Sequence, residues 1–161
     1  MFDWSGVYFK EIVRAPSSLV VLGYASFMVM MATGRFVGDS LIQKLGRKRT
    51  MQFSGLVIFT GMFTAVLFPY IISATIGFML VGLGVSGIVP TVYSSAGRNK
   101  KVSAGMALAM VSSVSYLGFL MGPPLIGYVS ALFNLRYSYG IIGCFGLLVT
   151  GMAAKVKAFE E

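Results

Sequence analysis

The amino-acid sequence predicts an all-α membrane protein. The chain has 161 residues, of which 57% are hydrophobic and only 11% are charged, with a mean hydropathy of +0.83. A soluble domain carries roughly 25% charged residues, so this chain has too little polar surface to solvate a globule of its size. Long apolar runs alternate with short basic segments, and the 20 glycines agree with membrane helices, in which glycine is common.

Charge and cysteine content exclude several functional classes. The net charge is +8, but the basic residues lie in short segments between apolar runs, as the positive-inside rule expects, so we expect no nucleic-acid partner. The chain has no histidine and one cysteine, Cys144, inside an apolar run. It can form no internal disulfide, no zinc site and no Ser-His or Cys-His pair. We therefore expect no metal, no cofactor and no enzymatic activity.

Residues 1–16 mix aromatic and charged side chains. Trp4 and Tyr8 are of the kind that gathers at membrane–water interfaces. We expect this segment to be the end of a preceding helix followed by an exterior loop.

The first full span is expected over residues 17–38. Pro16 followed by Ser17 is typical of a helix start. The run carries no charge before Arg35 and would extend roughly 33 Å as a helix, which is enough to cross the hydrocarbon core.

Residues 50–95 are apolar throughout and would extend roughly 69 Å as one helix, about twice the bilayer. The run must therefore fold back once. Pro69 marks the break because proline disfavours helix at the residue before it. The second and third spans are expected over residues 51–68 and 72–93.

Two further spans are expected near the C-terminus. A second basic segment, 96–103, leads into a fourth span over residues 104–133. A tight turn at 134–137 precedes a fifth span over residues 138–154. The sequence thus predicts one transmembrane domain, 1–161, with five full spans and the end of a sixth.

The distribution of basic residues predicts the orientation of the spans. One side carries nine bases: Lys44, Arg47, Lys48, Arg49, Arg98, Lys100, Lys101, Lys155 and Lys157. The other side carries three: Lys10, Arg14 and Arg136. The side with nine is expected in the cytoplasm, with the N-terminus outside and the C-terminus inside. We expect a multi-pass protein of the cell membrane, in bacteria the inner membrane. The odd number of spans suggests that a preceding helix is largely missing and that Met1 is an internal or truncated start.

A glycine-led helix end, an acid and a basic cluster link the first two spans. The residues that carry this pattern are Gly34, Gly38, Asp39, Gly46, Arg47 and Lys48. The pattern resembles motif A of the major facilitator superfamily, although four extra residues lie between Asp39 and Gly46. That longer form is similar to sugar-permease-type members related to fucose permease.

The resemblance implies a gating role for Asp39. A carboxylate at a helix end can pair with a base or with the positive N-terminus of a neighbouring helix. Such a latch would hold a cytoplasmic gate shut in one state and release it in the other. The alternative is that Asp39 is a solvated end cap and that the bases only set the topology.

The fourth expected span contains a small-residue and proline pattern: Gly118, Gly122, Pro123, Pro124 and Gly127. The pattern resembles part of motif C of the same superfamily, with the last glycine displaced by one position. It implies a hinge for alternating access, because the prolines kink the helix and free carbonyl groups. The alternative is tight packing of another helix against the two glycines.

The segment from Asp3 to Tyr8 resembles the end of the seventh helix of sugar-permease-like members. The chain then looks like the C-terminal half of a twelve-helix bundle, in which helices seven, eight, ten and eleven line the solute cavity. The cavity candidates are Asp3, Trp4, Tyr24, Ser112, Ser115 and Tyr116. The alternative for the serines is ordinary hydrogen bonding between helices.

The resemblance implies a secondary transporter that moves a small, sugar-like solute by alternating access. Its partners would be the solute, the lipid bilayer and a missing N-terminal helical half. No acid or histidine lies in the middle of an expected span, so a proton-coupling carboxylate is expected in the missing half or at Asp3. Two alternatives stay open: an efflux carrier for drugs or metabolites with the same fold, and a helical membrane subunit that transports nothing.

Overall fold

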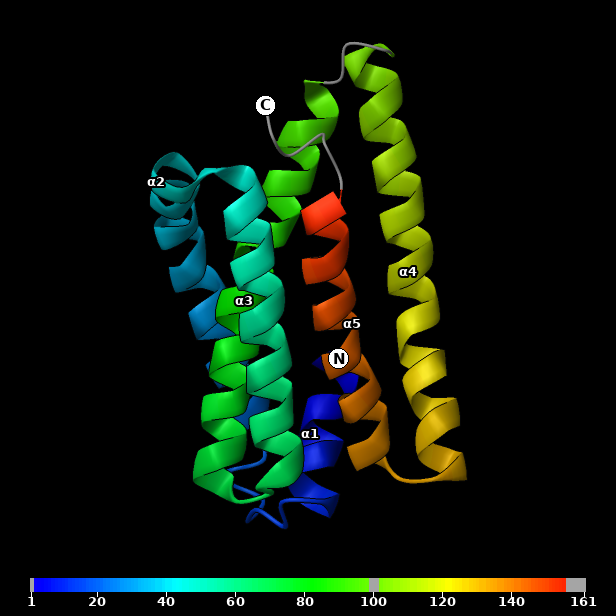
Figure 1. Cartoon of the computed structure of the whole chain (residues 1–161). Coiled ribbons are helices and arrows are strands. Elements are labelled where there is room, and N and C mark those ends of the chain that lie inside the picture. Colours follow the sequence, from blue (N-terminus) through cyan, green and yellow to red (C-terminus); the bar gives the residue numbers. More distant parts are fainter. Residues whose placement is uncertain (1, 99–101, 156–161) are drawn as a thin grey trace.

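The computed structural model describes residues 2–98 and 102–155, apart from the side chains of Phe2, Asp3 and Asp39. The described residues form helices and short connections. The helices are α1 (Phe2–Glu11), α2 (Leu22–Leu67), α3 (Ile71–Gly97), α4 (Ala104–Leu132) and α5 (Leu135–Lys155). α2 consists of two antiparallel helices that meet at Gly46 (Figure 1). The expectation of an all-helical protein is confirmed.

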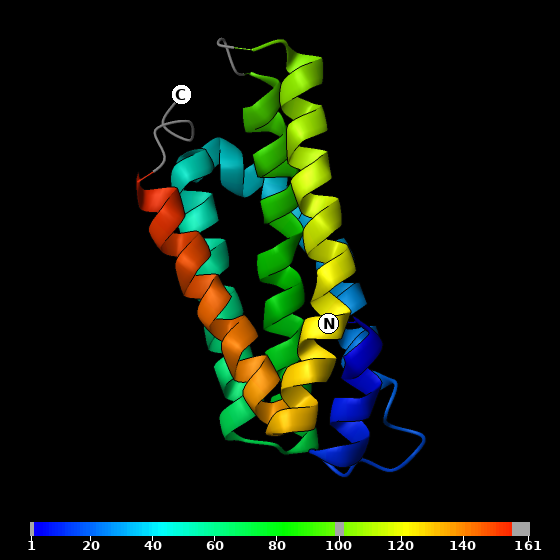
Figure 2. The same ribbon diagram turned by 90° about the vertical axis from the view of Figure 1, so that its right-hand side faces the viewer.

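The connections fall at two opposite ends of the bundle (Figures 1 and 2). Gly46 and the C-terminal ends of α3 and α5 lie at one end, which we call the kink end. The α2–α3 turn and the α4–α5 turn lie at the other, which we call the turn end. The bases of residues 44–49 and Arg136 are therefore at opposite ends, as the charge bias requires. Which end faces the cytoplasm stays a prediction.

Four helical segments of the described residues are long and apolar enough to cross a membrane: Ser40–Leu67, Ile71–Gly97, Ala104–Leu132 and Leu135–Lys155. The expected span at 17–38 is not among them. Residues 17–21 form a turn, with Leu19 N–H donating to Pro16 O and Leu22 N–H to Leu19 O, and the helix begins only at Leu22. The count of five full spans is therefore not confirmed.

The basic segment between the two halves of α2 is not the loop that its charges suggest. Helix continues through it on both sides, and only Gly46 departs from helical geometry, with φ 77° and ψ 163°. This left-handed φ is open to glycine because it has no Cβ. The Thr50 hydroxyl donates to Gly46 O at 2.8 Å, which ties the corner to the second half of α2.

The α4–α5 turn is shorter than the expected 134–137, because α5 begins at Leu135. The Asn134 side chain accepts from Arg136 N–H at 3.4 Å and starts the helix. The Arg136 guanidinium donates to Val66 O at 2.5 Å and to Leu67 O at 3.2 Å. It satisfies carbonyl groups that the end of α2 leaves without helical partners.

An aromatic cluster near the turn end holds α1 against the bundle. Tyr8 lies 4.8 Å from Tyr139 of α5 and 6.0 Å from Phe78 of α3, measured between ring centroids. The Tyr8 hydroxyl donates to Ala65 O of α2 at 2.7 Å. Phe9 packs edge-on against Phe78 at 5.5 Å. All four rings are fully or nearly fully buried, so α1 is joined to three other helices.

Elsewhere the helices meet through glycine. A Cβ on Gly77 would lie 2.5 Å from Gly61 O, so α3 and the second half of α2 touch backbone to backbone. A Cβ on Gly146 would lie 2.7 Å from Gly55 O, which is the same arrangement between α5 and α2. Small residues at such crossings let helix backbones approach closely in membranes. α4 differs, because most of its residues are exposed.

This packing predicts opposite effects of two identical substitutions. Gly77→Ala places a methyl group against the Gly61 carbonyl and should destabilise the fold by about 1–3 kcal/mol through overpacking. Gly118→Ala in α4 meets nothing within 4 Å, and it should be neutral or stabilising by up to about 1 kcal/mol through helix propensity. The midpoint of thermal denaturation in detergent compares them. Equal midpoints would contradict the packing described here.

Candidate functional site

The first two glycines of the motif A pattern lie in a close helix crossing. Gly34 is buried against α3, where a Cβ would lie 2.9 Å from Cβ of Ser86. One turn later, a Cβ on Gly38 would have Gly87 Cα as its nearest neighbour, at 3.9 Å. Gly34 therefore sets how closely the first half of α2 approaches α3, whereas a Cβ on Gly38 would make only an ordinary van der Waals contact.

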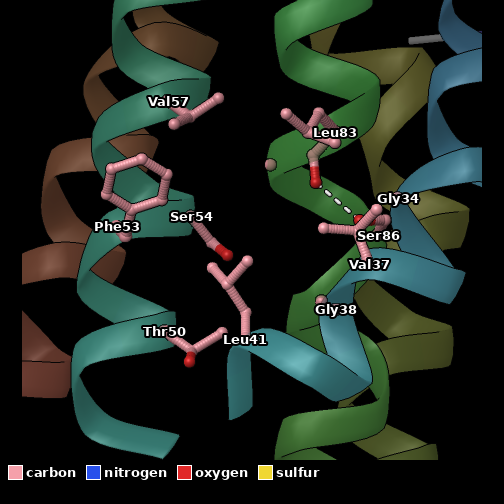
Figure 3. Close-up of a pocket in the computed structure, with 12 residues that line it drawn as sticks. Gly34, Val37, Gly38, Leu41, Thr50, Phe53, Ser54, Val57, Leu83 and Ser86 are labelled. Atoms are coloured by element: carbon pink, nitrogen blue, oxygen red, sulfur yellow. Dashed lines mark hydrogen bonds between the residues drawn. The ribbon is translucent and has the colours of Figure 1, made fainter. Parts of the chain in front are cut away.

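A cavity of about 70 Å³ lies beside this crossing, between the two halves of α2 and α3 (Figure 3). Its lining is mostly apolar, and Figure 3 shows the Ser54 hydroxyl pointing toward Leu41 across it. The Ser86 hydroxyl donates to Leu83 O at 2.6 Å and is held within its own helix. The cavity therefore adjoins the first half of α2 on the side that faces the second half and α3.

The charged part of the motif A pattern forms a helical corner. Asp39 belongs to the helical part of α2, and its side chain lies outside the described residues. Arg47 and Lys48 follow Gly46 directly and are half-buried, whereas Lys44 and Arg49 are exposed. The sequence indicated these residue types but not the corner, because only the φ of Gly46 distinguishes a corner from a loop.

A second group of predicted residues meets between α1 and α4. The Trp4 indole N–H donates to Pro123 O at 3.2 Å. A Cβ on Gly127 would lie 2.9 Å from Cζ2 of Trp4, so the missing side chain of Gly127 makes room for the ring. The structure thus joins Trp4, predicted as a cavity residue, to the predicted hinge of α4.

An open pocket of about 500 Å³ surrounds this contact. It is lined by Trp4, Val7, Pro123, Pro124, Gly127 and Tyr128. The sequence analysis missed Tyr128, which is exposed and supplies a second aromatic ring. Its spacing of four residues from Pro124 places it on the same helix face, and that is the signal that was available.

The other predicted cavity residues do not line this pocket. Tyr24 and Tyr116 are exposed on α2 and α4, and Ser115 is exposed as well. Ser112 shares a hydrogen bond of 3.1 Å with the Tyr93 hydroxyl of α3, as the alternative of interhelical bonding expects. Asp3 lies in α1, and its side chain is outside the described residues.

The two leading glycines of the α4 pattern pack no helix here. A Cβ on Gly118 or on Gly122 would meet nothing within 4 Å in the part of the chain that the structure describes. No described helix packs against this pair, so the hinge and the tight-packing interpretations both stay predictions. Of the three glycines, only Gly127 has a described side chain, that of Trp4, so close that a Cβ would clash with it.

Comparison with known proteins identifies the family. Residues 4–158 match the Major Facilitator Superfamily. The chain belongs to the major facilitator superfamily. This confirms the family resemblance and the membrane setting of the chain. The match does not assign the chain to the sugar-permease branch of the family, which stays a prediction.

Curated relatives include three bacterial membrane proteins. The chain is 34% identical over 158 residues to an uncharacterized MFS-type transporter of Yersinia pestis. It is 33% identical over 147 residues to the membrane protein MosC of Rhizobium meliloti, and 32% identical over 155 residues to an uncharacterized transporter of Sinorhizobium fredii. It covers 40%, 36% and 41% of the lengths of these three relatives.

Solved structures support the fold. A crystal structure of a mutant of the peptide transporter POT in complex with sulfate superposes with a TM-score of 0.82 at 15% identity, covering 97% of this chain and 34% of that one. A complex of the same transporter with alafosfalin gives a TM-score of 0.79 at 14% identity. The major facilitator fold therefore accounts for the bundle.

The contact between α1 and α4 can be followed by fluorescence, because Trp4 is the only tryptophan of the chain. Gly127→Ala puts a methyl group against the indole and should displace it from Pro123 O. We expect Trp4 emission to move to longer wavelength as the ring becomes hydrated. Gly122→Ala is the matched control, since a Cβ there would have no neighbour within 4 Å among the described residues. Identical emission spectra for the two variants would contradict the contact.

Proposed function

We propose that the chain is the C-terminal half of a secondary transporter that moves a small, sugar-like solute by alternating access. The observation that carries the proposal is the match to the Major Facilitator Superfamily over residues 4–158. In this proposal α1 is the end of helix seven and the later helices are eight to twelve, with the two halves of α2 counted separately. A preceding N-terminal helical half would complete the bundle.

The extent of the similarity supports the assignment to one half. The chain covers about two-fifths of its curated relatives and about one-third of the peptide transporter with the same fold. Solute sites in such carriers lie at the interface of two structural repeats. A half-bundle therefore supplies one wall of the site.

The wall that we propose for the solute is the pocket between α1 and α4. Trp4 and Tyr128 present two aromatic rings there, and such rings offer a flat apolar face together with a polar edge. A sugar-like solute suits such rings because it has apolar C–H faces and polar hydroxyl groups. Asp3, Tyr24, Ser112, Ser115 and Tyr116 stay candidates for the remainder of the cavity, with Asp3 adjoining Trp4 in α1.

The gate that we propose is the corner of α2 at the kink end. Gly34 allows the first half of α2 to lie close to α3, and we propose that the adjoining cavity gives that half space to shift. Asp39 would latch this corner in one state and release it in the other. The kink end would then be cytoplasmic, because residues 44–49 supply much of the positive charge.

The hinge that we propose is the proline pair of α4. Ile126, beyond the prolines, is buried, and the Ser138 hydroxyl donates to Ile126 O at 3.2 Å. Before the prolines, Ala107 is the only buried residue of α4 among those described. This difference supports bending at Pro123 and Pro124, with the turn-end part of α4 as the fixed part.

The transport proposal predicts activity only when both halves are present. Vesicles that contain this chain together with its N-terminal half should take up labelled sugar-like solute, and vesicles with the chain alone should not, because the solute site lacks its second wall. Uptake of drug-like cations in place of sugars would favour the efflux alternative. Absence of any uptake or exchange in the complete bundle would favour a helical subunit without transport activity.

The latch proposal predicts that loss of the Asp39 charge slows solute exchange and leaves insertion of the protein into the membrane unchanged. In the complete bundle, Asp39→Asn should slow solute exchange by about tenfold, the size of a coupling of roughly 1.4 kcal/mol. Lys44→Gln in the same segment is the control for a change of surface charge. The amount of protein in the membrane should be unchanged, since topology depends on the bases. Exchange at the parental rate would rule out the latch.

A further inference from the structure

A third pocket lies at the kink end and belongs neither to the solute wall nor to the cavity beside Gly34. It has a volume of about 280 Å³ and is lined by Ile42, Gln43, Arg47, Pro90, Thr91 and Ser94. We propose that this pocket binds the phosphate headgroup of an anionic phospholipid. The proposal depends on the membrane setting of the protein and not on what it transports.

The corner at Gly46 builds one wall of the pocket. Gln43 lies in the last turn of the first half of α2, and Arg47 is the first residue of the second half. Because the chain reverses at Gly46, two successive helices bring a side chain to the same pocket. The opposite wall is the C-terminal part of α3, which carries Thr91 and Ser94.

The lining offers the groups that a phosphate diester requires. The Arg47 guanidinium is a planar fork of several N–H donors, so it can contact phosphate oxygens in addition to the partner that it has within the protein. The Gln43 amide and the Ser94 hydroxyl are neutral donors on the two walls. The Thr91 hydroxyl donates to Gly87 O at 2.6 Å, and its side chain is buried, so Thr91 shapes the wall of the pocket and supplies no donor to the headgroup.

The surroundings favour an anion attached to an apolar tail. Four bases lie at residues 44–49, and Asp39 is the one acid between residues 34 and 49. Ile42 and Pro90 give the pocket an apolar edge, and Leu45 and Phe36 are exposed on the same part of α2. Basic pockets between membrane helices at the cytoplasmic surface are suited to anionic headgroups.

The positive-inside rule alone does not account for this arrangement. That rule requires only that bases are present near the membrane surface, wherever their side chains lie. The rule does not require that one of these bases, Arg47, lines a pocket together with polar side chains of α2 and α3. The distinction can be tested, because Lys44 carries the same charge in the same segment and does not line the pocket.

The experiment measures lipid retention. The chain is reconstituted in nanodiscs of mixed phosphatidylglycerol and phosphatidylcholine, and lipids that remain bound after extraction are counted by native mass spectrometry. We expect retained phosphatidylglycerol in preference to phosphatidylcholine. Arg47→Gln should lower retention by about five- to tenfold, the size of one basic contact at an anionic surface. Ser94→Phe, which fills the pocket without changing the charge, should lower it similarly.

The control variant is Lys44→Gln, which should retain phosphatidylglycerol as the parent does. A loss in Lys44→Gln equal to that in Arg47→Gln, or full retention in Ser94→Phe, would mean that the bases act as a diffuse charge and would overturn the proposal. Displacement of the lipid by millimolar glycerol phosphate would also overturn it, because the occupant would then be a soluble phosphate. Circular dichroism of each variant identifies any that fail to fold.

Discussion

The close approach of helix backbones at glycine is the constraint on which this bundle depends. Lipid tails are as apolar as the side chains that face them, so burial of apolar surface contributes little to the association of helices in a membrane. The backbones are in contact at Gly61 and Gly77, and again at Gly55 and Gly146. The dispersion attraction at these contacts takes the place of apolar burial as the force that holds the helices together. The second half of α2, α3 and α5 become one rigid unit, and the other elements are positioned by it.

That rigid unit fixes the corner at the kink end. The second half of α2 is locked to α3, so the first half can reach α3 only by reversing at Gly46, whose left-handed φ requires glycine. The reversal carries Gly34 and Gly38 onto α3 and brings Arg47 beside Thr91 and Ser94. The proposed gate and the proposed lipid site are two consequences of the same corner.

α4 stands apart from the rigid unit, and the few contacts that hold it decide what it can do. Its turn-end part is fixed by Trp4 at Pro123 O and by Ser138 at Ile126 O. Its kink-end part is mostly exposed and shares the bond between Ser112 and Tyr93 with α3. A helix held firmly on one side of a proline pair and loosely on the other is suited to bend there. The aromatic cluster of Tyr8, Phe9, Phe78 and Tyr139 keeps Trp4 in place by anchoring α1.

The sequence by itself determined that the chain is helical and membrane-embedded, and it located the break at Pro69 and the family patterns. These follow from composition, run length and proline chemistry, which are local properties. It misplaced the start of α2, because Pro16 and Ser17 form a turn that no periodicity distinguishes from a helical start. It also treated 44–49 only as a basic link between two spans, since charge does not reveal that the segment is helical and that only Gly46 leaves the helix. Only the tertiary structure decided that Trp4 meets Gly127, that Gly118 has no neighbour among the described residues, and that Arg47 lines a pocket with α3. Each of these depends on which helix lies opposite, and that is set by backbone crossings between residues far apart in the chain.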